Sequence, residues 1–351
     1  HLARTDPAGL DRTESVCLPH DYLTWRMTGV FATDRGDASG TGWWSPGEHR
    51  ERRDLLALAI GDKAAHRIAL PEVYGPNAVV GALLPGPAAE LGLPAGIAVG
   101  PGSGDNMEAA LGIGANAGEM VISLGTSGTA FAISRFPTND ESGEVCGFAD
   151  ATGHFLPLAC MLNCTRVVDS IAGMLGVNRI DALDRANRLA PGAEGLLLMP
   201  YFEGERTPNL PRATGEIIGL ASATATPDLM IRAAVDGVAA GLAYCVIALN
   251  RLGIEASEVT LVGGGSQHSA WRQAIADATG MTVLVREAGE AAARGAALQA
   301  AAIALDAPVD QVIGRWRPPV IAEIAPRPDQ RASFRLDERQ SMIDAMRARY
   351  R

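Results

Sequence analysis

The sequence predicts an α/β protein with two domains. A length of 351 residues, 47% of them hydrophobic, is enough for two domains of ordinary size that each bury a core. Residues 259–305 have the pattern of strand, glycine-rich loop, helix, strand and helix, which is typical of an α/β unit. Upstream, residues 119–134 contain two β-rich runs around a tight turn, which predicts a hairpin.

The charge balance limits the partners that we expect. Lysine and arginine total 30 against 40 aspartate and glutamate residues, so the formal net charge is −10. An acidic surface argues against nucleic acid or an anionic membrane as the main partner. The sequence also has no run of 18 or more apolar residues, so we expect no membrane-spanning segment.

The five cysteines predict a reducing compartment. Cys17, Cys146, Cys160, Cys164 and Cys245 are odd in number and include no Cys-x-x-Cys pair, which favours reduced, buried thiols in a cytoplasmic protein. Cys160 and Cys164 are four residues apart, but no second cysteine or histidine pair accompanies them. We therefore expect no zinc site there.

The N-terminal part of the chain predicts short helices and loops. Residues 21–29 have the pattern of a helix with a glycine stop, and residues 51–68 predict another helix. Between them, residues 33–44 predict a polar, glycine-rich turn that ends in Trp43 and Trp44. Two interpretations of this turn are equally strong: a loop with a hydrophobic anchor, or the wall of a polyol site, because hydroxyl-rich ligands need short polar groups beside an aromatic surface.

An acidic residue follows the next predicted strand. Residues 97–101 predict a buried strand, Gly102–Gly104 open the chain at its end, and Asp105 and Asn106 begin a helix that runs to Leu111. An aspartate at a helix start is usually an N-cap. The order of strand, glycine loop and acid is also how a carboxylate is offered at the C-terminal edge of a sheet, where ligands bind.

The turn of the predicted hairpin could hold an anion. Gly125, Thr126, Ser127 and Gly128 connect the two strands. The glycines allow positive φ and a close approach of a ligand to the backbone, and the hydroxyls and N–H groups could surround a phosphate. Taken alone, the same sequence fits an ordinary hairpin turn.

The rest of the chain continues the α/β pattern. Thr226 and Pro227 have the positions of an N-cap and a first helical residue, and the helix ends near Leu252, before Gly253. Residues 203–208 predict a loop with solvent-exposed ion pairs. The other expected elements are strands over 155–161, 259–262 and 282–285, a buried run over 196–202, helices over 165–175, 181–189, 269–279, 291–305 and 336–350, and a proline-rich connection over 306–335.

Three glycines follow the strand at 259–262. Gly263, Gly264 and Gly265 would let a flat ring or a phosphate approach the backbone at the start of a helix. The loop lacks the Gly-x-Gly-x-x-Gly spacing, so it is weak evidence for a dinucleotide.

Six sequence blocks, in order along the chain, resemble the FGGY carbohydrate kinases. The blocks are Pro19-His20-Asp21-Tyr22-Leu23 with Arg26–Gly29, Asp37–Thr41, Gly104–Asn106, Ser123–Gly128, Leu198–Tyr201 with Gly204–Pro208, and Val262–Gly265 with Trp271–Gln273 and Ala276-Asp277. Each block alone is unspecific, but six in the family's order span nearly the whole chain.

The resemblance implies a fold and a division of the chain. The family has two actin-like (ribonuclease H-like) ATPase domains that close over a cleft. In this sequence, residues 1–113 would be the C-terminal part of the first, sugar-side domain. Residues 114–325 would be the second, nucleotide-side domain, and residues 326–351 a C-terminal helix.

The resemblance also implies a reaction and its residues. Family members transfer the γ-phosphoryl group of ATP to a sugar hydroxyl in the presence of Mg²⁺. By resemblance Asp105 is the catalytic base and, through water, a partner of the metal, and Asn106 binds the sugar. Gly125 and Thr126 match the hairpin that holds the ATP phosphates, whereas Gly264, Gly265 and Ser269 match the adenosine pocket.

The closest subgroup by motif is the xylulokinases, which convert D-xylulose to D-xylulose 5-phosphate. Gly-Asp-Asn at 104–106 and the Gly-Thr-Ser-Gly hairpin resemble that subgroup, but gluconokinases share the hairpin sequence. Another sugar or polyol kinase is therefore one alternative, and a non-catalytic nucleotide-binding protein or catalytically dead fragment is another. A protein that only binds a nucleotide needs no catalytic base, so the presence of Gly104-Asp105-Asn106 argues against the non-catalytic nucleotide-binding alternative. Family members are often dimers, although no motif here indicates a homodimer.

The start of the chain departs from the family pattern. The family opens with a strand and an Asp-Leu-Gly-Thr-Ser turn that binds phosphates, and the present sequence begins at His1 without them. We therefore expect a first domain that is incomplete at its N-terminus. His20 and Gln267 also stand where other residues are usual in the family, at positions that are not catalytic there.

Overall fold

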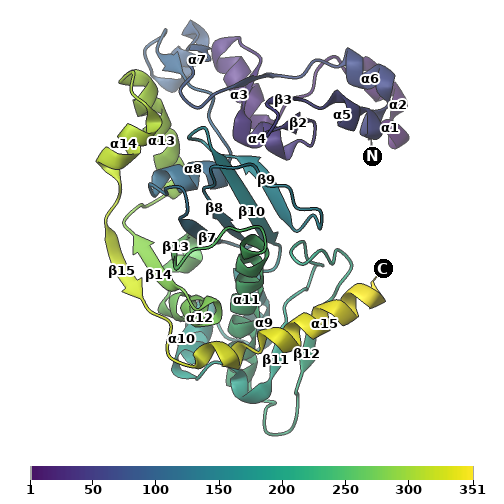
Figure 1. The fold of residues 1–351 in the computed structure, drawn as a ribbon, viewed down its shortest axis with the longest axis vertical. Coiled ribbons are helices and arrows are strands. Elements are labelled where there is room, and N and C mark those ends of the chain that lie inside the picture. The colour runs from purple at the N-terminus through teal and green to yellow at the C-terminus, as the bar shows by residue number, and fades with distance from the viewer. Residues whose placement is uncertain (1, 351) are drawn as a thin grey trace.

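The centre of the molecule is a mixed sheet of seven strands, shown in Figure 1. The structure is a computed structural model and describes residues 2–350. The order of the strands is β15-β14-β13-β7-β8-β10-β9, in which β13 runs parallel to β7 and β14 and the other pairs are antiparallel. The strands are β7 (Met120–Leu124), β8 (Gly128–Ala132), β9 (Val145–Ala149), β10 (Phe155–Met161), β13 (Glu258–Val262), β14 (Thr282–Arg286) and β15 (Val320–Ile324).

Helices cover both faces of this sheet, so its central strands β7, β8, β10 and β13 are mostly buried, whereas the edge strand β15 is largely exposed. In β7, Met120, Ile122 and Leu124 face one core while Val121 faces the other, because successive side chains of a strand alternate. The helices of the first core are α9 (Thr165–Met174), α10 (Arg179–Arg188), α11 (Pro227–Asn250) and α12 (Ser269–Thr279). Those of the second core are α8 (Asp105–Gly112), α13 (Ala291–Ala304) and α14 (Val309–Trp316).

Helix α11 is the central helix of the first core. The side chain of Thr226 accepts a hydrogen bond from the backbone N–H of Leu229, and Pro227 is the first helical residue, so the predicted start is confirmed. Among the described residues it is the one helix long and apolar enough to cross a membrane, but 89% of its most apolar window is buried inside the protein. Its hydrophobicity is therefore explained by packing.

The N-terminal residues form a layer of short elements at the top of Figure 1. Helix α3 ends at Gly29, which has a φ of 78°, so the predicted glycine stop is confirmed. The elements are α1 (Leu2–Thr5), α2 (Pro7–Arg12), α3 (Pro19–Thr28), β1 (Ala32–Asp34), α4 (Arg35–Gly40), β2 (Trp44–Ser45), β3 (Arg50–Glu51), α5 (Arg53–Ile60), α6 (Asp62–Arg67), β4 (Glu72–Tyr74), β5 (Gly81–Ala82), α7 (Pro85–Leu91) and β6 (Ala98–Val99).

Three predictions for this layer were wrong. The predicted helix at 51–68 is two helices, α5 and α6, because Gly61 with a φ of 85° separates them. Residues 33–44 are not a simple turn, because Asp34 accepts hydrogen bonds from the backbone N–H groups of Gly36 and Asp37 and so starts α4. Trp44 is buried against Ala38 and Ala149, which supports the hydrophobic-anchor interpretation of this stretch. The predicted buried strand at 97–101 is only the two-residue, half-exposed β6, because its one partner is the equally short β5.

Two further predictions failed in the C-terminal half. The loop at 203–208 has the predicted exposed ion pair only at Glu203, which pairs with Arg166, whereas Glu205 is 1% exposed and accepts hydrogen bonds from the Leu162 N–H and the Asn163 amide. Residues 306–335 are not merely a connection, because they include α14 and the edge strand β15. Two short strands, β11 (Leu197–Met199) and β12 (Glu216–Ile218), pair beside α11.

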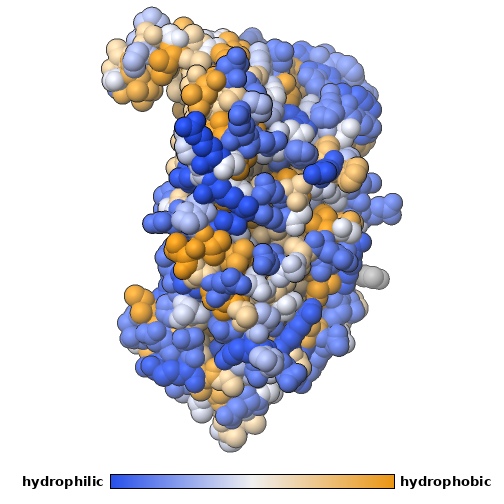
Figure 2. Space-filling view, turned by 60° about the vertical axis from the view of Figure 1, so that its left-hand side comes forward, coloured by the Kyte–Doolittle hydropathy of each residue, from blue (hydrophilic) through white to orange (hydrophobic). Residues whose placement is uncertain are grey.

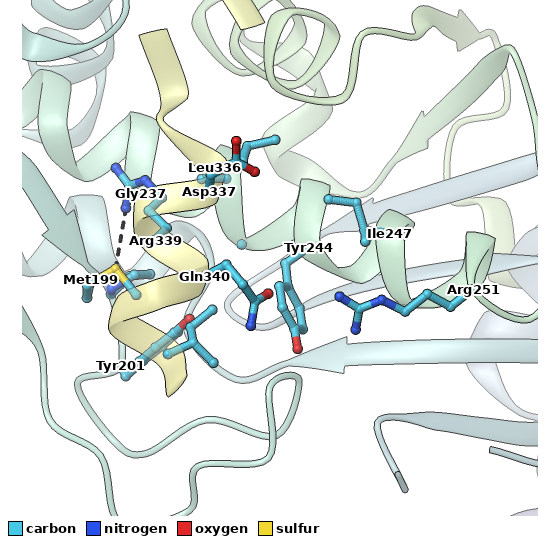
Figure 3. Close-up of a pocket in the computed structure, with 14 residues that line it drawn as sticks. Met199, Tyr201, Gly237, Tyr244, Ile247, Arg251, Leu336, Asp337, Arg339 and Gln340 are labelled. Atoms are coloured by element: carbon cyan, nitrogen blue, oxygen red, sulfur yellow. Dashed lines mark hydrogen bonds between the residues drawn. The ribbon is translucent and has the colours of Figure 1, made fainter. Parts of the chain in front are cut away.

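The C-terminal helix α15 (Leu336–Arg349) lies across the end of α11 that is near β11, as Figure 1 shows. A cavity of about 170 Å³ separates part of α15 from α11, and Figure 3 shows Tyr244, Gln340 and Arg251 around it. Although the helix was predicted as polar, Ile343 and Met346 are buried and anchor it. The side of the molecule that Figure 2 shows is mostly hydrophilic. Its hydrophobic residues form separate patches instead of one continuous apolar area.

Candidate active site

A cavity of about 350 Å³ lies where α8 meets the ends of β7, β13 and β14. Helix α8 is held there by close backbone contact with α13: a Cβ added at Gly112 would lie 1.9 Å from the Ala291 carbonyl oxygen, and one at Gly295 would lie 1.9 Å from the Glu108 carbonyl oxygen. Only glycine permits such an approach. The cavity is lined by Asp105, Asn106, Ala109, Ser123, Leu261–Gly264, Ser266, Gln267, Val285, Arg286, Ala288–Ala292 and Ile321.

The glycine loop and the hairpin form adjoining walls of this region. The parallel register pairs Val262 with Ser123, so both strands end at the same edge of the sheet. Gly263 has a φ of 84°, and a Cβ there would lie 2.7 Å from the Leu124 carbonyl oxygen. At Gly264 an added Cβ would meet nothing within 4 Å, so its backbone is open to the cavity. A flat or anionic ligand can therefore reach the peptide groups of the loop.

The hairpin turn is held by hydrogen bonds from the start of helix α9. The Gly125 carbonyl accepts hydrogen bonds from the N–H and the hydroxyl of Thr165, at 3.2 and 2.8 Å. The Thr126 carbonyl accepts a hydrogen bond from the Cys164 N–H at 3.2 Å. Thr126 and Ser127 are exposed, and neither hydroxyl has a hydrogen-bond partner among the described residues. The turn thus offers two free hydroxyls on a rigid base.

Asp105 is the first residue of α8, and Gly104 is its N-cap. The carboxylate is exposed, and its Oδ1 accepts hydrogen bonds from the backbone N–H and the side-chain amide of Asn106, at 2.7 and 2.8 Å. Oδ2 has no hydrogen-bond partner among the described residues. One carboxylate oxygen is therefore fixed, and the other is free to accept a proton at the cavity.

Thr129 is a contact of this pair that sequence reasoning missed. Its hydroxyl donates a hydrogen bond of 2.8 Å to Oδ1 of Asn106, which orients the amide so that its nitrogen faces Asp105. Thr129 pairs directly with Ser123 across the hairpin. The sequence predicts the hairpin without its register, and the pairing of Thr129 with Ser123 follows from Gly128 pairing with Leu124 and not belonging to the turn.

The structure brings some of the predicted residues together and separates others. Asp105, Asn106 and Gly264 line the cavity, while Gly265 packs beneath it against Leu124. Gly125 and Thr126 are near its edge but do not line it. Ser269 does not line it either, because it is the first residue of α12 and its hydroxyl accepts a hydrogen bond from Asn187 at 3.3 Å.

Several lining residues were not predicted as site residues. Ser266 and Gln267 follow the glycine loop, Arg286 ends β14, Glu290 precedes α13, and Ile321 lies on β15. Burial and the nearby Arg317 lower the pKa of Arg286, whose guanidinium donates to the Pro318 carbonyl at 3.1 Å. Ser266 and Gln267 adjoin the predicted glycine loop, whereas Arg286 and Ile321 reach the cavity through the pairing of β14 and β15, which the local sequence pattern does not reveal.

The oxygen atoms at this edge suit a magnesium ion that is held through water. Mg²⁺ prefers oxygen ligands and usually keeps several waters while it contacts one or two carboxylates. Asp105 offers its free Oδ2, and Glu290 is a second exposed carboxylate on the cavity wall. The residues therefore fit the metal expected with a nucleoside triphosphate.

Comparison with known families assigns the fold. Residues 2–112 match the N-terminal domain of the FGGY family of carbohydrate kinases, and residues 120–304 match the C-terminal domain of the same family. The chain belongs to the FGGY family of carbohydrate kinases. The predicted two-domain, actin-like (ribonuclease H-like) fold is thereby confirmed.

Relatives with high identity are xylulose kinases. The chain is 42% identical to the xylulose kinase of Streptomyces rubiginosus over 316 residues, which are 90% of this chain and 63% of that one. It is 41% identical to the enzyme of Streptomyces coelicolor, again over 90% of this chain and 63% of the relative. The chain thus spans about 63% of the length of these FGGY kinases.

A solved xylulose kinase has the same fold. The structure from Bifidobacterium adolescentis matches this FGGY chain with a TM-score of 0.82 and 35% sequence identity. The match covers 96% of this chain and 71% of the other. Nearly every element described above, including the N-terminal layer, therefore has a counterpart in a solved relative.

Proposed function

We propose that this FGGY chain is part of an ATP-dependent sugar kinase that converts D-xylulose to D-xylulose 5-phosphate. The observation that carries the proposal is Asp105, whose free carboxylate oxygen faces the same cavity as the open glycine loop. The names and identities of the relatives support D-xylulose as the acceptor. The open backbone at Gly264 supports a nucleotide as the donor.

In the proposed reaction Asp105 acts as the general base. Its Oδ2 removes the proton from the attacking sugar hydroxyl, whose oxygen forms a bond to the γ-phosphorus as the bond from that phosphorus to the bridging oxygen of ADP breaks. Asn106 holds Oδ1 and retains one amide N–H that can donate to a sugar hydroxyl. Positioning of this kind supplies most of the catalysis in phosphoryl transfer.

The donor phosphates would lie between the hairpin turn and the glycine loop. The free hydroxyls of Thr126 and Ser127 and the backbone of Gly264 provide hydrogen-bonding groups there. Mg²⁺, held through water by Asp105, would neutralise charge on the phosphates when bound. No lysine lines the cavity among the described residues, so Arg286 is the cationic side chain closest to this role.

A panel of acceptors tests the proposal. ADP release would be measured with ATP, Mg²⁺ and either D-xylulose, gluconate, glycerol or L-ribulose, using the 351-residue chain and, beside it, the product of the complete gene. We expect turnover with D-xylulose by the complete product. Turnover with another acceptor instead would keep the kinase assignment and reject the substrate, whereas no turnover with any acceptor would contradict the kinase assignment.

A further inference from the structure

A histidine and three aspartates form a charged cluster outside the cavity. Nε2 of His20 lies 3.1 Å from Oδ1 of Asp34 and 2.8 Å from Oδ2 of Asp37, and its Nδ1 lies 3.2 Å from Oδ1 of Asp21. Asp21 and Asp34 are 1% and 4% exposed. Both ring nitrogens thus lie within ion-pair distance of a carboxylate, although Oδ1 of Asp21 accepts no hydrogen bond, and this surrounding negative charge favours an imidazolium over a neutral ring.

The cluster touches the loop that precedes Asp105. Oδ2 of Asp34 accepts a hydrogen bond of 2.9 Å from the hydroxyl of Ser103. A Cβ added at Gly104 would lie 2.5 Å from Oδ1 of Asp37, so this carboxylate is packed against the N-cap of α8. The two aspartates that bind His20 therefore hold the residues directly before Asp105.

His20 is the cation that directly contacts Asp34 and Asp37 and partly neutralises their negative charge. Among the described residues, no lysine or arginine forms an ion pair with Asp34 or Asp37, although the buried Arg35 acts on Asp34 electrostatically from a greater distance. A fourth acid lies nearby: Glu108 is 4% exposed, neither of its carboxylate oxygens has a hydrogen-bond partner, and burial and the charges of Asp34 and Asp37 raise its pKa to about 8. Buried carboxylates that lose their partner are strongly destabilised.

The ionisation of His20 agrees with this role. Burial lowers the pKa of His20, but hydrogen bonds to Asp34 and Asp37 and the charges of Asp34 and Asp21 together raise it from 6.5 to about 10. The imidazole is therefore protonated at neutral pH. A divalent metal is the rival occupant, since the ligand atoms of His20, Asp34 and Asp37 all lie within 4.8 Å of one another. It would have to displace this tightly held proton.

We propose that His20 is a positioning residue, whose positive charge holds Asp34 and Asp37 in place and so fixes the Ser103–Gly104 segment that carries Asp105. The inference rests on the proposed role of Asp105 as the base. His20 does not itself line the cavity, so it acts through the two aspartates. A displacement of the base by about 1 Å is enough to cost about 100-fold in rate.

Two substitutions at His20 separate charge from shape. His20→Gln keeps hydrogen-bonding groups without the charge, whereas His20→Lys keeps one positive charge. In the complete gene product we expect His20→Gln to lower kcat by about 10- to 100-fold with the KM for ATP nearly unchanged. His20→Lys should restore most of kcat. The matched control is His66→Gln, because His66 is an exposed histidine of the same layer that bonds only to the Asp62 carbonyl.

A variant at another position tests the inference even if the His20 variants do not fold. Ser103→Ala removes only the hydroxyl that joins the loop to Asp34, and we expect it to lower kcat by about 2- to 10-fold. Hydrogen–deuterium exchange at residues 102–106 gives a readout independent of activity. Exchange should be faster in His20→Gln than in the wild type and should return toward the wild-type rate in His20→Lys.

The outcomes distinguish this inference from the proposed function. An inactive wild type whose loop still loosens in His20→Gln would reject the kinase assignment and keep the structural role of His20. An active wild type with unchanged kcat and exchange in His20→Gln would overturn the inference alone. Stoichiometric zinc in the purified wild type, absent from His20→Gln, would also overturn it, because the cluster would then be a metal site.

Discussion

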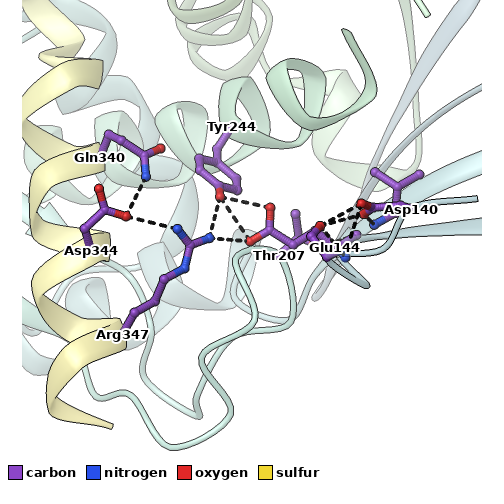
Figure 4. A network of polar contacts seen from close by, with 9 residues as sticks. Asp140, Glu144, Thr207, Tyr244, Gln340, Asp344 and Arg347 are labelled. Carbon is purple, nitrogen blue, oxygen red and sulfur yellow. Dashed lines mark hydrogen bonds and ion pairs between the residues drawn. The ribbon is translucent and has the colours of Figure 1, made fainter. Parts of the chain in front are cut away.

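Two regions of the molecule bury a carboxylate beside a single, partly exposed cation. In the first, His20 neutralises Asp34 and Asp37 behind the loop that carries Asp105. In the second, shown in Figure 4, Glu144 accepts hydrogen bonds from the Tyr244 hydroxyl at 3.1 and 3.0 Å and from Arg347 at 2.6 Å. A buried carboxylate paired with one cation thus occurs both beside the loop that carries Asp105 and in a second region that does not contact this loop.

The His20 cluster and the Glu144 cluster contact different elements of the structure. The Glu144 cluster joins the start of β9 to α11 and to α15, and Thr207 donates a further hydrogen bond of 2.8 Å to the Glu144 carbonyl. None of these residues lines the cavity that contains Asp105. We therefore expect the Glu144 cluster to affect stability alone, whereas the His20 cluster, which contacts the loop before Asp105, should affect activity as well as stability.

The largest effect should come from Arg347. Substitution by methionine leaves Glu144 buried without its cation, which we expect to lower the free energy of unfolding by about 2–3 kcal/mol. This is less than for a fully buried pair, because Arg347 is partly exposed. Urea unfolding gives the value. The control is Arg166→Met, which breaks the exposed pair with Glu203 and should cost less than about 1 kcal/mol.

The same variant also tests the division of roles. Arg347→Met should retain the kcat of the wild type at a temperature where both are folded. A loss of kcat as large as that of His20→Gln, without a loss of stability, would show that the two clusters do not have separate functions.

A second prediction concerns the pH dependence of stability. The pKa of His20 is raised from 6.5 to about 10 in the folded state, so its contribution is fully present below pH 6.5 and is lost as pH rises toward 10. The pKa of Glu108 is raised from 4.5 to about 8. Its contribution to the free energy of unfolding is therefore also lost as the pH rises, between 4.5 and about 8. Stability should therefore fall from pH 5 to pH 10.

Single variants separate the contribution of Glu108 from that of His20 to this loss of stability as the pH rises. Urea unfolding across the pH range should show less loss below pH 8 in Glu108→Gln and less loss above pH 7 in His20→Gln. Since His20 belongs to the first cluster and Glu108 is influenced by the charges of its aspartates, Arg347→Met should keep the wild-type slope. A wild-type stability that rises from pH 6 to pH 9 would show that the raised pKa values are wrong.

The smallest effect is expected at Thr129. Replacement by valine keeps the shape but removes the hydrogen bond to Asn106, so that the amide can turn away from Asp105. One hydrogen bond of this kind is worth about 1 kcal/mol, which corresponds to a fall in kcat of about 5-fold. Thr129→Ser keeps the hydroxyl and should retain wild-type kcat. Equal rates in the serine and valine variants would deny Thr129 a role in positioning.

The sequence predicted those elements whose signals are local. The start of α11 is specified by Thr226 and Pro227, and the hairpin by the tight turn at 125–127 between β-rich runs. Helix α4 was missed because its start depends on the side chain of Asp34, within a stretch whose glycines indicate a turn. The burial of Glu205 was missed for a different reason, since its partners Leu162 and Asn163 are about 40 residues away in the chain.

The candidate site follows the same rule. Asp105 and Gly264 belong to short motifs, and the structure places both on one cavity. Arg286 and Ile321 line that cavity because β14 and β15 pair at the edge of the sheet, which no local pattern shows. Ser269 was chosen by resemblance, but the helix start turns its hydroxyl toward Asn187.

The most direct test of the central claim is the replacement of Asp105 by asparagine in the complete gene product. The variant keeps the size of the side chain but has no carboxylate to accept the proton. The account predicts that D-xylulose-dependent ADP release falls by about 10²- to 10⁴-fold while ATP binding, measured by calorimetry, is unchanged. An Asn variant with the full activity of the wild type would contradict the account.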